Sequence, residues 1–310
     1  MMMATISAGL VKELRDKTGA GMMDCKKALK ETNADIEEAI DWLRTKGLAA
    51  AAKKSGRVAS EGLVGIASKG TKGSIIEVNS ETDFVSRNGE FQSLVRNVAE
   101  VTLDTAGDIS EISGSIYPET QRTVQEEITH QIATIGENIS LRRAQTLSVT
   151  NGIIATYVHS ALAEGLGKIG VLLALESEGD RKKLASLGKQ LAMHVAAARP
   201  EWISKDDVSA DDQERERKVL REQASDTGKT PDIIEKMVDG RMRKFYEEVC
   251  LLEQTYVIDN ETKISKVLEG AIKDIGAEIA IKGFICYGLG EGIVKEASDF
   301  AAEVAATAGA

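Results

Sequence analysis

The stretch Ser74-Ile75-Ile76-Glu77-Val78-Asn79-Ser80-Glu81-Thr82-Asp83-Phe84-Val85 joins an alternating segment to an unusual loop. The alternation over residues 74–78 predicts a β-strand, so the chain leaves a sheet shortly after it. A large ring, Phe84, follows next to two carboxylates. Continued alternation would turn Phe84 inward, whereas Asp83 beside it favours solvent. From the residues alone, Phe84 is either an anchor in its own core or a wedge for a partner.

A hairpin followed by a helix is predicted twice in the chain. Around the opening stretch, period-two segments flank the turn at 69–73, and an apolar helical stripe follows at Phe91, Leu94, Val95, Val98 and Val101. Residues 153–158 and 169–175 repeat the strand pattern before a second stripe at Leu184, Leu187, Leu191 and Val195. The recurrence predicts an α+β fold with two related subdomains.

Helices are predicted on both sides of these subdomains. The first 50 or so residues indicate three short helices, with Ser7 as a cap, Gly47 at a left-handed C-terminal cap and 49–56 as a linker. A charged stretch, 206–248, predicts a helical hairpin. A last strand is expected at 279–287, and an alanine-rich helix from Ile293.

Composition narrows the classes of function. The formal net charge of −10, with lysines interleaved among glutamates, argues against direct nucleic-acid binding. Three scattered cysteines predict neither a disulfide framework nor a zinc site, and a reducing cytoplasm is the expected location. We expect no bound metal or cofactor. No export signal or membrane-spanning run is apparent in the sequence.

Candidate reactive groups have ordinary structural explanations. The spacing of Gly288, Gly290 and Gly292 favours a strand-to-helix turn over a nucleotide loop. The three histidines are far apart, and Cys25 lacks a positioned base, so no catalytic residue is predicted. Met22 and Met23 are adjacent on a short helix, which leaves open whether one faces outward as a binding residue or both pack against different partners.

Several ordered motifs closely resemble bacterial elongation factor Ts, a family of nucleotide-exchange partners of elongation factor Tu. They are Thr18-Gly19-Ala20-Gly21-Met22-Met23, Thr82-Asp83-Phe84-Val85, Gly136-Glu137-Asn138-Ile139 with Arg142-Arg143, Tyr157-Val158-His159 with Ile169-Gly170-Val171-Leu172, Met193-His194-Val195-Ala196-Ala197, and Gly240-Arg241-Met242-Arg243-Lys244-Phe245. Two departures are Ser80, where the family often has cysteine, and 161–165, which lengthen the second hairpin near His159.

The resemblance implies a domain plan in five parts. Its parts are a ubiquitin-associated-like three-helix module (1–54), a first core subdomain (57–150), a second core subdomain (151–204 and 247–288), a coiled-coil hairpin insert (205–246) and a C-terminal module (289–310). The hairpin could also pair with a second copy to form a homodimer.

The resemblance also implies a function without covalent chemistry, namely guanine-nucleotide exchange on elongation factor Tu. Thr82, Asp83, Phe84 and Val85, the wedge loop, would displace Mg²⁺ in the partner, while Leu14, Met22, Met23 and His159 would bind it. Two alternatives remain open. One is an adaptor that binds proteins without altering nucleotide affinity, and the other is an enzyme that uses Cys25 or the glycines at 288–292.

Overall fold

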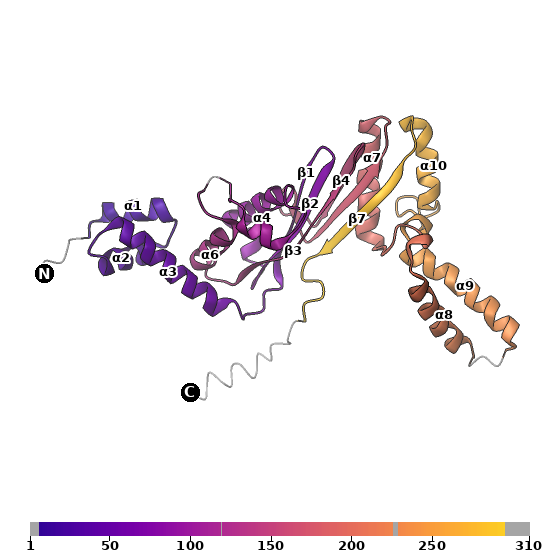
Figure 1. Cartoon of the computed structure of the whole chain (residues 1–310), viewed down its shortest axis with the longest axis horizontal. Helices are drawn as coiled ribbons and strands as arrows, with labels where there is room; N and C mark the ends of the chain where they lie inside the picture. The colour runs from indigo at the N-terminus through magenta and orange to yellow at the C-terminus, as the bar shows by residue number, and fades with distance from the viewer. Residues whose placement is uncertain (1–5, 119, 226–228, 295–310) are drawn as a thin grey trace.

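A computed structural model describes residues 6–118, 120–225 and 229–294. The fold is α+β, as predicted, with helices surrounding two small antiparallel sheets. In Figure 1 the sheets lie in the middle of an elongated molecule, with three helices at one end and a projecting helical pair at the other.

Three helices form the N-terminal end: α1 (Ala8–Thr18), α2 (Met22–Glu31) and α3 (Ile36–Lys54). The Ser7 hydroxyl accepts the N–H of Leu10, which confirms the predicted cap. The predicted break at Gly47 is wrong, because α3 continues through it to Lys54. Alanines after Gly47 are strong helix formers that outweigh one glycine, and Ala51 packs against the first core.

The first sheet has the strand order β3-β2-β1-β5. Its strands are β1 (Glu61–Lys69), β2 (Lys72–Ser80), β3 (Ile139–Ser148) and the short β5 (Leu166–Gly167). The turn η1 (Val85–Arg87) and three helices follow β2: α4 (Gly89–Thr102), α5 (Ile109–Gly114) and α6 (Val124–Ile135). Phe91, Leu94 and Val98 of α4 are fully buried on one face of this sheet, as the helical stripe predicts.

The second sheet has the order β4-β6-β7. Its strands are β4 (Gly152–His159), β6 (Ile169–Glu176) and β7 (Ala280–Gly288), and its helices are α7 (Arg181–Ala198) and α10 (Ile264–Ile275). In each half a hairpin is followed by a helix (α4 or α7), a last helix (α6 or α10) and a returning strand (β3 or β7), so the recurrence seen in the sequence is present in the topology. The first half has the short α5 in addition. The C-terminal caps match as well, since Gly136 and Gly276 are both left-handed after α6 and α10.

The two sheets pack back to back, and their helices cover the outer faces. Val64 and Ile75 of the first sheet meet Ile154 and Leu172 of the second in a shared core. Glycine permits this close approach, because a Cβ on Gly170 would lie 2.7 Å from Cγ1 of Val64. The lengthened connection after His159 supplies β5, which pairs with β1 and so joins the second half to the first sheet.

A helical hairpin projects from the second half, as the charged stretch predicts (Figure 1). It consists of α8 (Ala210–Ser225) and α9 (Pro231–Val249), flanked by the short turns η2 (Lys205–Asp207) and η3 (Leu251–Glu253). Leu220, Val238 and Met242 form its apolar seam, and ion pairs such as Arg221–Glu235 (2.7 Å) lie along its flanks.

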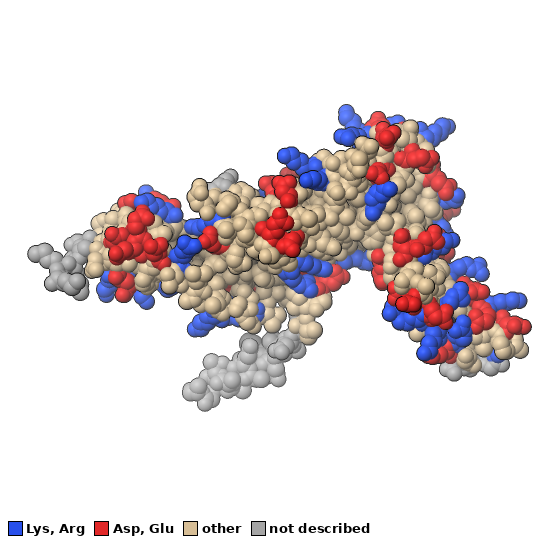
Figure 2. All heavy atoms as spheres, viewed as in Figure 1, with Lys and Arg blue, Asp and Glu red and all other residues tan. Residues whose placement is uncertain are grey.

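The predicted C-terminal helix falls on residues 295–310, which lie outside the described part of the chain, apart from its first residues, 293–294. Among the described residues, no helix is long and apolar enough to cross a membrane. Figure 2 shows acidic side chains grouped on the viewed face of the N-terminal helices with basic side chains around them, whereas both signs are mixed over the projecting hairpin.

Candidate partner-binding site

The aromatic side chain of Phe84 is exposed. It retains 76% of its accessible surface, although Val85 beside it is buried in the first core. The strand β2 ends at Ser80, so the alternation that would have turned Phe84 inward does not continue. Burying such a ring against a partner would remove a large apolar surface from water, so the exposed ring is suited to binding.

Hydrogen bonds on both sides hold the loop that carries Phe84. The Glu137 carboxylate accepts the Thr82 N–H at 2.9 Å and the Thr82 hydroxyl at 2.6 Å. On the other side, the Ser86 hydroxyl donates to the Asp83 carbonyl at 2.6 Å, and the Arg87 N–H donates to the Phe84 carbonyl at 3.1 Å. The ring is therefore exposed on a backbone that is locally fixed.

Both methionines after the glycine-rich turn are exposed, Met22 by 60% and Met23 by 76%. They occupy the first turn of α2, whose buried side is formed by Cys25, Ala28 and Leu29. Both methionine side chains therefore face outward, and neither packs in the core of the N-terminal helices. Unbranched, polarisable methionine side chains adapt readily to an apolar partner surface.

Leu14, which the resemblance implies as a partner-binding residue, is not on the surface. Its side chain is fully buried in the core of the three N-terminal helices. In this structure it has no surface to offer a partner, because α2 and α3 cover it. Its contribution is to hold α1 against the helix that carries the two exposed methionines.

His159 ends β4 and is exposed. Its Nδ1 lies 3.2 Å from the Tyr157 hydroxyl, so the neighbouring ring orients the imidazole. The position pairs with Ile169 on β6, at the end of the second sheet that meets the start of β1.

Residues close to these positions in the chain or in the sheets line two shared cavities. Gly19, just before the exposed methionines, and Gly89, just after the Phe84 loop, line one cavity of about 310 Å³. At the other side, Glu61, which pairs with Ser80, and Lys168, whose N–H donates to the His159 carbonyl, line a second cavity. The predicted site residues themselves line neither cavity, so the link runs through residues beside them.

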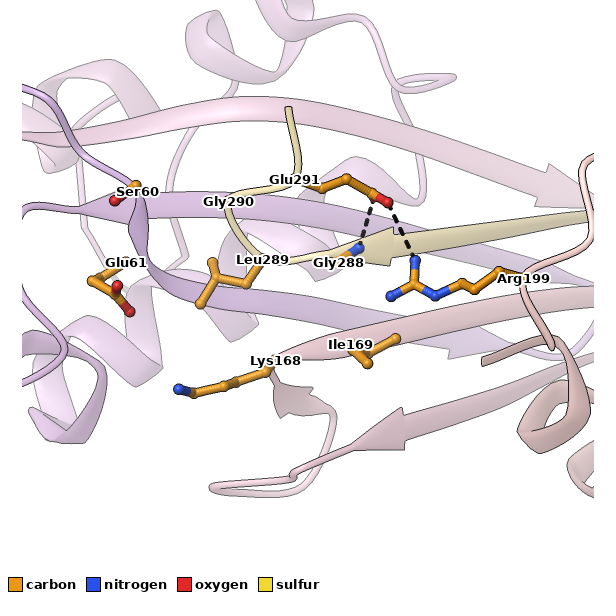
Figure 3. A pocket seen from close by; sticks show the side chains of 9 residues that line it. All are labelled: Ser60, Glu61, Lys168, Ile169, Arg199, Gly288, Leu289, Gly290 and Glu291. Atoms are coloured by element: carbon orange, nitrogen blue, oxygen red, sulfur yellow. Dashed lines mark hydrogen bonds and ion pairs between the residues drawn. The ribbon is translucent and has the colours of Figure 1, made fainter. Parts of the chain in front are cut away.

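That second cavity, of about 420 Å³, is lined by Gly288 and Gly290, two of the three glycines whose spacing suggests a nucleotide loop (Figure 3). Figure 3 shows the Glu291 side chain directed at the Gly288 backbone and at Arg199, with an ion pair of 3.5 Å to Arg199. The Gly290 N–H donates to the Glu77 carboxylate at 2.8 Å. These backbone donors are engaged by the protein's own carboxylates, so the loop is a turn after β7 and not a phosphate cradle.

Glu77 is a buried carboxylate that the sequence analysis missed. Arg142 contacts it at 3.1 Å and Arg143 at 2.6 Å, and Arg143 also donates to the Gly288 carbonyl at 2.8 Å. Burial raises the pKa of Glu77, but hydrogen bonds from Gly290, Asn79 and Arg143 together hold it below its usual value. The sequence did contain a signal for this buried ion pair. A glutamate stands between Ile76 and Val78 inside an apolar strand, and an arginine pair occurs farther along the chain.

Two other groups that could be reactive, Cys25 and His194, are buried in the protein core. Cys25 is buried, and burial raises the pKa of its thiol, which opposes a nucleophilic role. His194 is a core histidine: its Nδ1 accepts the Val257 N–H, so its Nε2–H donates to the Gln254 side chain at 2.9 Å. Burial lowers the pKa of His194. Within the described ranges, no group of three potential metal ligands occurs.

Comparison with known proteins gives the family. The family model described as Elongation factor TS matches residues 81–291. Elongation factor Ts of Rhodospirillum centenum is 61% identical over 307 residues, covering 99% of this chain and 100% of the relative. That of Paramagnetospirillum magneticum is 62% identical over 307 residues (99% and 98%), and that of Rhodospirillum rubrum 61% over 305 (98% and 99%). The chain belongs to the elongation factor Ts family.

The part matched by the elongation factor Ts model begins at Glu81 and ends at Glu291. It therefore includes the Phe84 loop, Glu137 and His159, while α1–α3 precede it. The whole-length likeness to the relatives extends through those three helices, since 99% of the chain is covered. The exposed methionines and the exposed phenylalanine thus both lie in the part of the chain that these relatives cover.

Proposed function

We propose that this protein is a guanine-nucleotide exchange factor for elongation factor Tu and acts without covalent chemistry in the cytoplasm. The observation that carries the proposal is Phe84, an exposed ring on a loop fixed by Glu137 and by the buried Val85. Family membership supports the choice of partner.

The proposed mechanism is displacement of Mg²⁺ in the partner. Phe84, presented by Thr82, Asp83 and Val85, inserts into the nucleotide-binding domain and shifts the element that holds the ion. Mg²⁺ demands near-ideal octahedral geometry and bridges the phosphates, so a small displacement of its ligands weakens GDP strongly.

The free energy from burying Phe84 alone is too small for the proposed effect, so additional contacts with the partner are required. Burying one phenylalanine yields about 1.5–3 kcal/mol, whereas weakening GDP by 10⁴ needs about 5.5 kcal/mol of differential affinity. We assign the remaining contacts to Met22, Met23 and His159. Coupling is reciprocal, so GDP must weaken this protein's binding as much as this protein weakens GDP.

Release of fluorescent GDP from purified elongation factor Tu, with Mg²⁺ present, tests the proposal. Increasing concentrations of this protein should accelerate release to a plateau. The double variant Met22→Ala/Met23→Ala should need a higher concentration to reach its plateau. Ile258→Ala, an exposed apolar side chain in the second half, is the matched control and should behave as the wild type. A stable complex with no acceleration would reject exchange and favour the adaptor function.

A further inference from the structure

The motif Gly136-Glu137-Asn138 connects α6 to β3, and the proposed function uses Glu137 only as a support of the Phe84 loop, without assigning it an effect on exchange. The Glu137 carboxylate accepts two hydrogen bonds from Thr82, which lies 55 residues earlier in the sequence: one from the backbone N–H at 2.9 Å and one from the hydroxyl at 2.6 Å. In return, the Asn138 N–H donates to the Glu81 carboxylate at 2.6 Å. The adjacent residues Glu81 and Thr82 are therefore hydrogen-bonded to the adjacent residues Glu137 and Asn138.

A third segment joins this arrangement. The Asn138 side chain donates to the Arg57 carbonyl at 2.8 Å, and the Arg57 guanidinium lies 3.4 Å from both oxygens of Glu81. Arg57 follows the end of α3 closely, at Lys54. The clamp, which we define as Arg57, Glu81, Glu137 and Asn138, thus connects the exit of the N-terminal helices to the loop that carries Phe84.

The geometry points to Glu137 as a positioning residue for Phe84, an inference that rests on the proposed function. Thr82 lies two residues before the ring, and the buried Val85 lies one residue after it. With both points fixed, only a short exposed span carries the ring. Ordering a loose loop upon binding costs free energy comparable to what burial of one ring returns, so a loop fixed in advance lets the ring act on the partner.

The second half of the molecule provides an internal comparison. After α10, the segment Gly276-Ala277-Glu278-Ile279 takes the place of Gly136-Glu137-Asn138-Ile139, so Ala277 stands where Glu137 does. The strand-to-helix connection before α7 spans only 177–180, against 81–88 before α4, and it contains no aromatic residue. The second half adopts the same architecture with alanine at this position. The fold therefore does not require a carboxylate here, and within this chain the carboxylate occurs in the half that carries the exposed ring.

The test separates positioning from simple structural support. Glu137→Ala removes the acceptor, whereas Glu137→Gln keeps an oxygen for the Thr82 N–H and gains an amide that can donate to the hydroxyl. For each variant, the rate of GDP release from elongation factor Tu is measured against factor concentration. We expect Glu137→Ala to lower the plateau rate about tenfold and to move the half-saturating concentration by less than about threefold, with Glu137→Gln restoring most of the rate.

A double-mutant cycle shows whether Glu137 acts through the ring. In the Phe84→Ala background, Glu137→Ala should cause no further loss, because the group being positioned is absent. Glu278→Ala, at an exposed glutamate in the equivalent segment, is the control and should keep the wild-type rate. Equal fractional losses with and without Phe84 would overturn the inference while leaving exchange activity established.

Amide hydrogen exchange of the free protein gives a readout that needs no partner. The Thr82 N–H should exchange at least tenfold faster in Glu137→Ala than in the wild type, and Glu278→Ala should leave it unchanged. Unaltered protection in Glu137→Ala would reject the clamp. If the wild type fails to accelerate GDP release, the proposed function falls, and the assignment of Glu137 to exchange falls with it, even where hydrogen exchange shows that it holds the loop.

Discussion

At the scale of single residues, two phenylalanines seven positions apart have opposite surroundings. Phe84 is 76% exposed, whereas Phe91 on α4 is fully buried between that helix and the first sheet. The helical spacing around Phe91 predicted its burial. The sequence could not place Phe84, because the outcome depends on where β2 ends and on the hydrogen bonds that Glu137 makes from far along the chain.

This pair gives a direct prediction for stability. Phe84→Ala should change the free energy of unfolding by less than about 0.5 kcal/mol, since the ring has few contacts to lose. Phe91→Ala should lower it by about 3–5 kcal/mol, since a cavity replaces a packed ring. Urea unfolding followed by circular dichroism compares the two. A large loss in Phe84→Ala would show that this ring supports its own core.

Glu77 is the residue at which stability should depend on pH. Its native pKa lies below the usual value of 4.5, so its ionised form favours the folded state. Glu77→Gln should cost about 2–3 kcal/mol near neutral pH, because the two arginines lose their charged partner.

The stability gap between wild type and Glu77→Gln has a defined pH range. It should be constant above about pH 6, where Glu77 is ionised in both the folded and the unfolded state. It should shrink as the pH falls from 4.5 through the lower native value, because the unfolded wild type then binds a proton at Glu77 that the folded protein does not bind until lower pH. Urea unfolding at a series of pH values measures this. A gap that grows on acidification would contradict the sign of the shift.

At the scale of elements, α3 shows the limit of local rules. A glycine near the end of an apolar pattern normally marks a C-terminal cap, yet Gly47 lies inside a 19-residue helix. The alanines that follow, and the packing of α3 on α6, decide the outcome. Elsewhere predictions from local sequence are confirmed. Ser7 caps α1, and the alternating segments form β1, β2, β4 and β6.

Gly47→Ala should stabilise the protein. A Cβ there would lie 3.5 Å from Cβ of Ala133, an ordinary contact, and alanine is favoured over glycine in a helix interior by about 0.5–1 kcal/mol. Thermal unfolding of the variant beside the wild type measures the gain. Gly240→Ala, in α9 with open space around the added methyl group, is a matched case in the hairpin. A loss of stability in Gly47→Ala alone would mean that α3 and α6 cannot accommodate a methyl group.

At the scale of the whole molecule, the two halves form one body through their sheets. The sequence predicted two similar halves but not their back-to-back packing, nor that the long connection after His159 would return β5 to the first sheet. Such pairings join residues about 100 positions apart, and no local pattern encodes them. The clamp on Phe84 was beyond local reasoning for the same reason.

Gly170 is the position at which to disturb this packing. An added methyl group would lie 2.7 Å from Val64, 3.0 Å from Ile66 and 3.1 Å from Ile75. Gly170→Ala should therefore lower the free energy of unfolding by about 1–3 kcal/mol through overpacking. Urea unfolding measures the loss, with Gly283→Ala, whose nearest contact is a leucine methyl at 3.3 Å, as the milder comparison. Full stability in Gly170→Ala would show that the sheets separate easily.

We propose that Phe84 promotes GDP release by displacing Mg²⁺ in elongation factor Tu. The most direct measurement is the plateau rate of fluorescent-GDP release with saturating wild type or Phe84→Ala, first with Mg²⁺ and then after its chelation. We expect a wild-type rate far above that of the variant when Mg²⁺ is present, and a much smaller difference between the two rates once the ion has been removed. Equal rates for the two proteins in the presence of Mg²⁺ would contradict it.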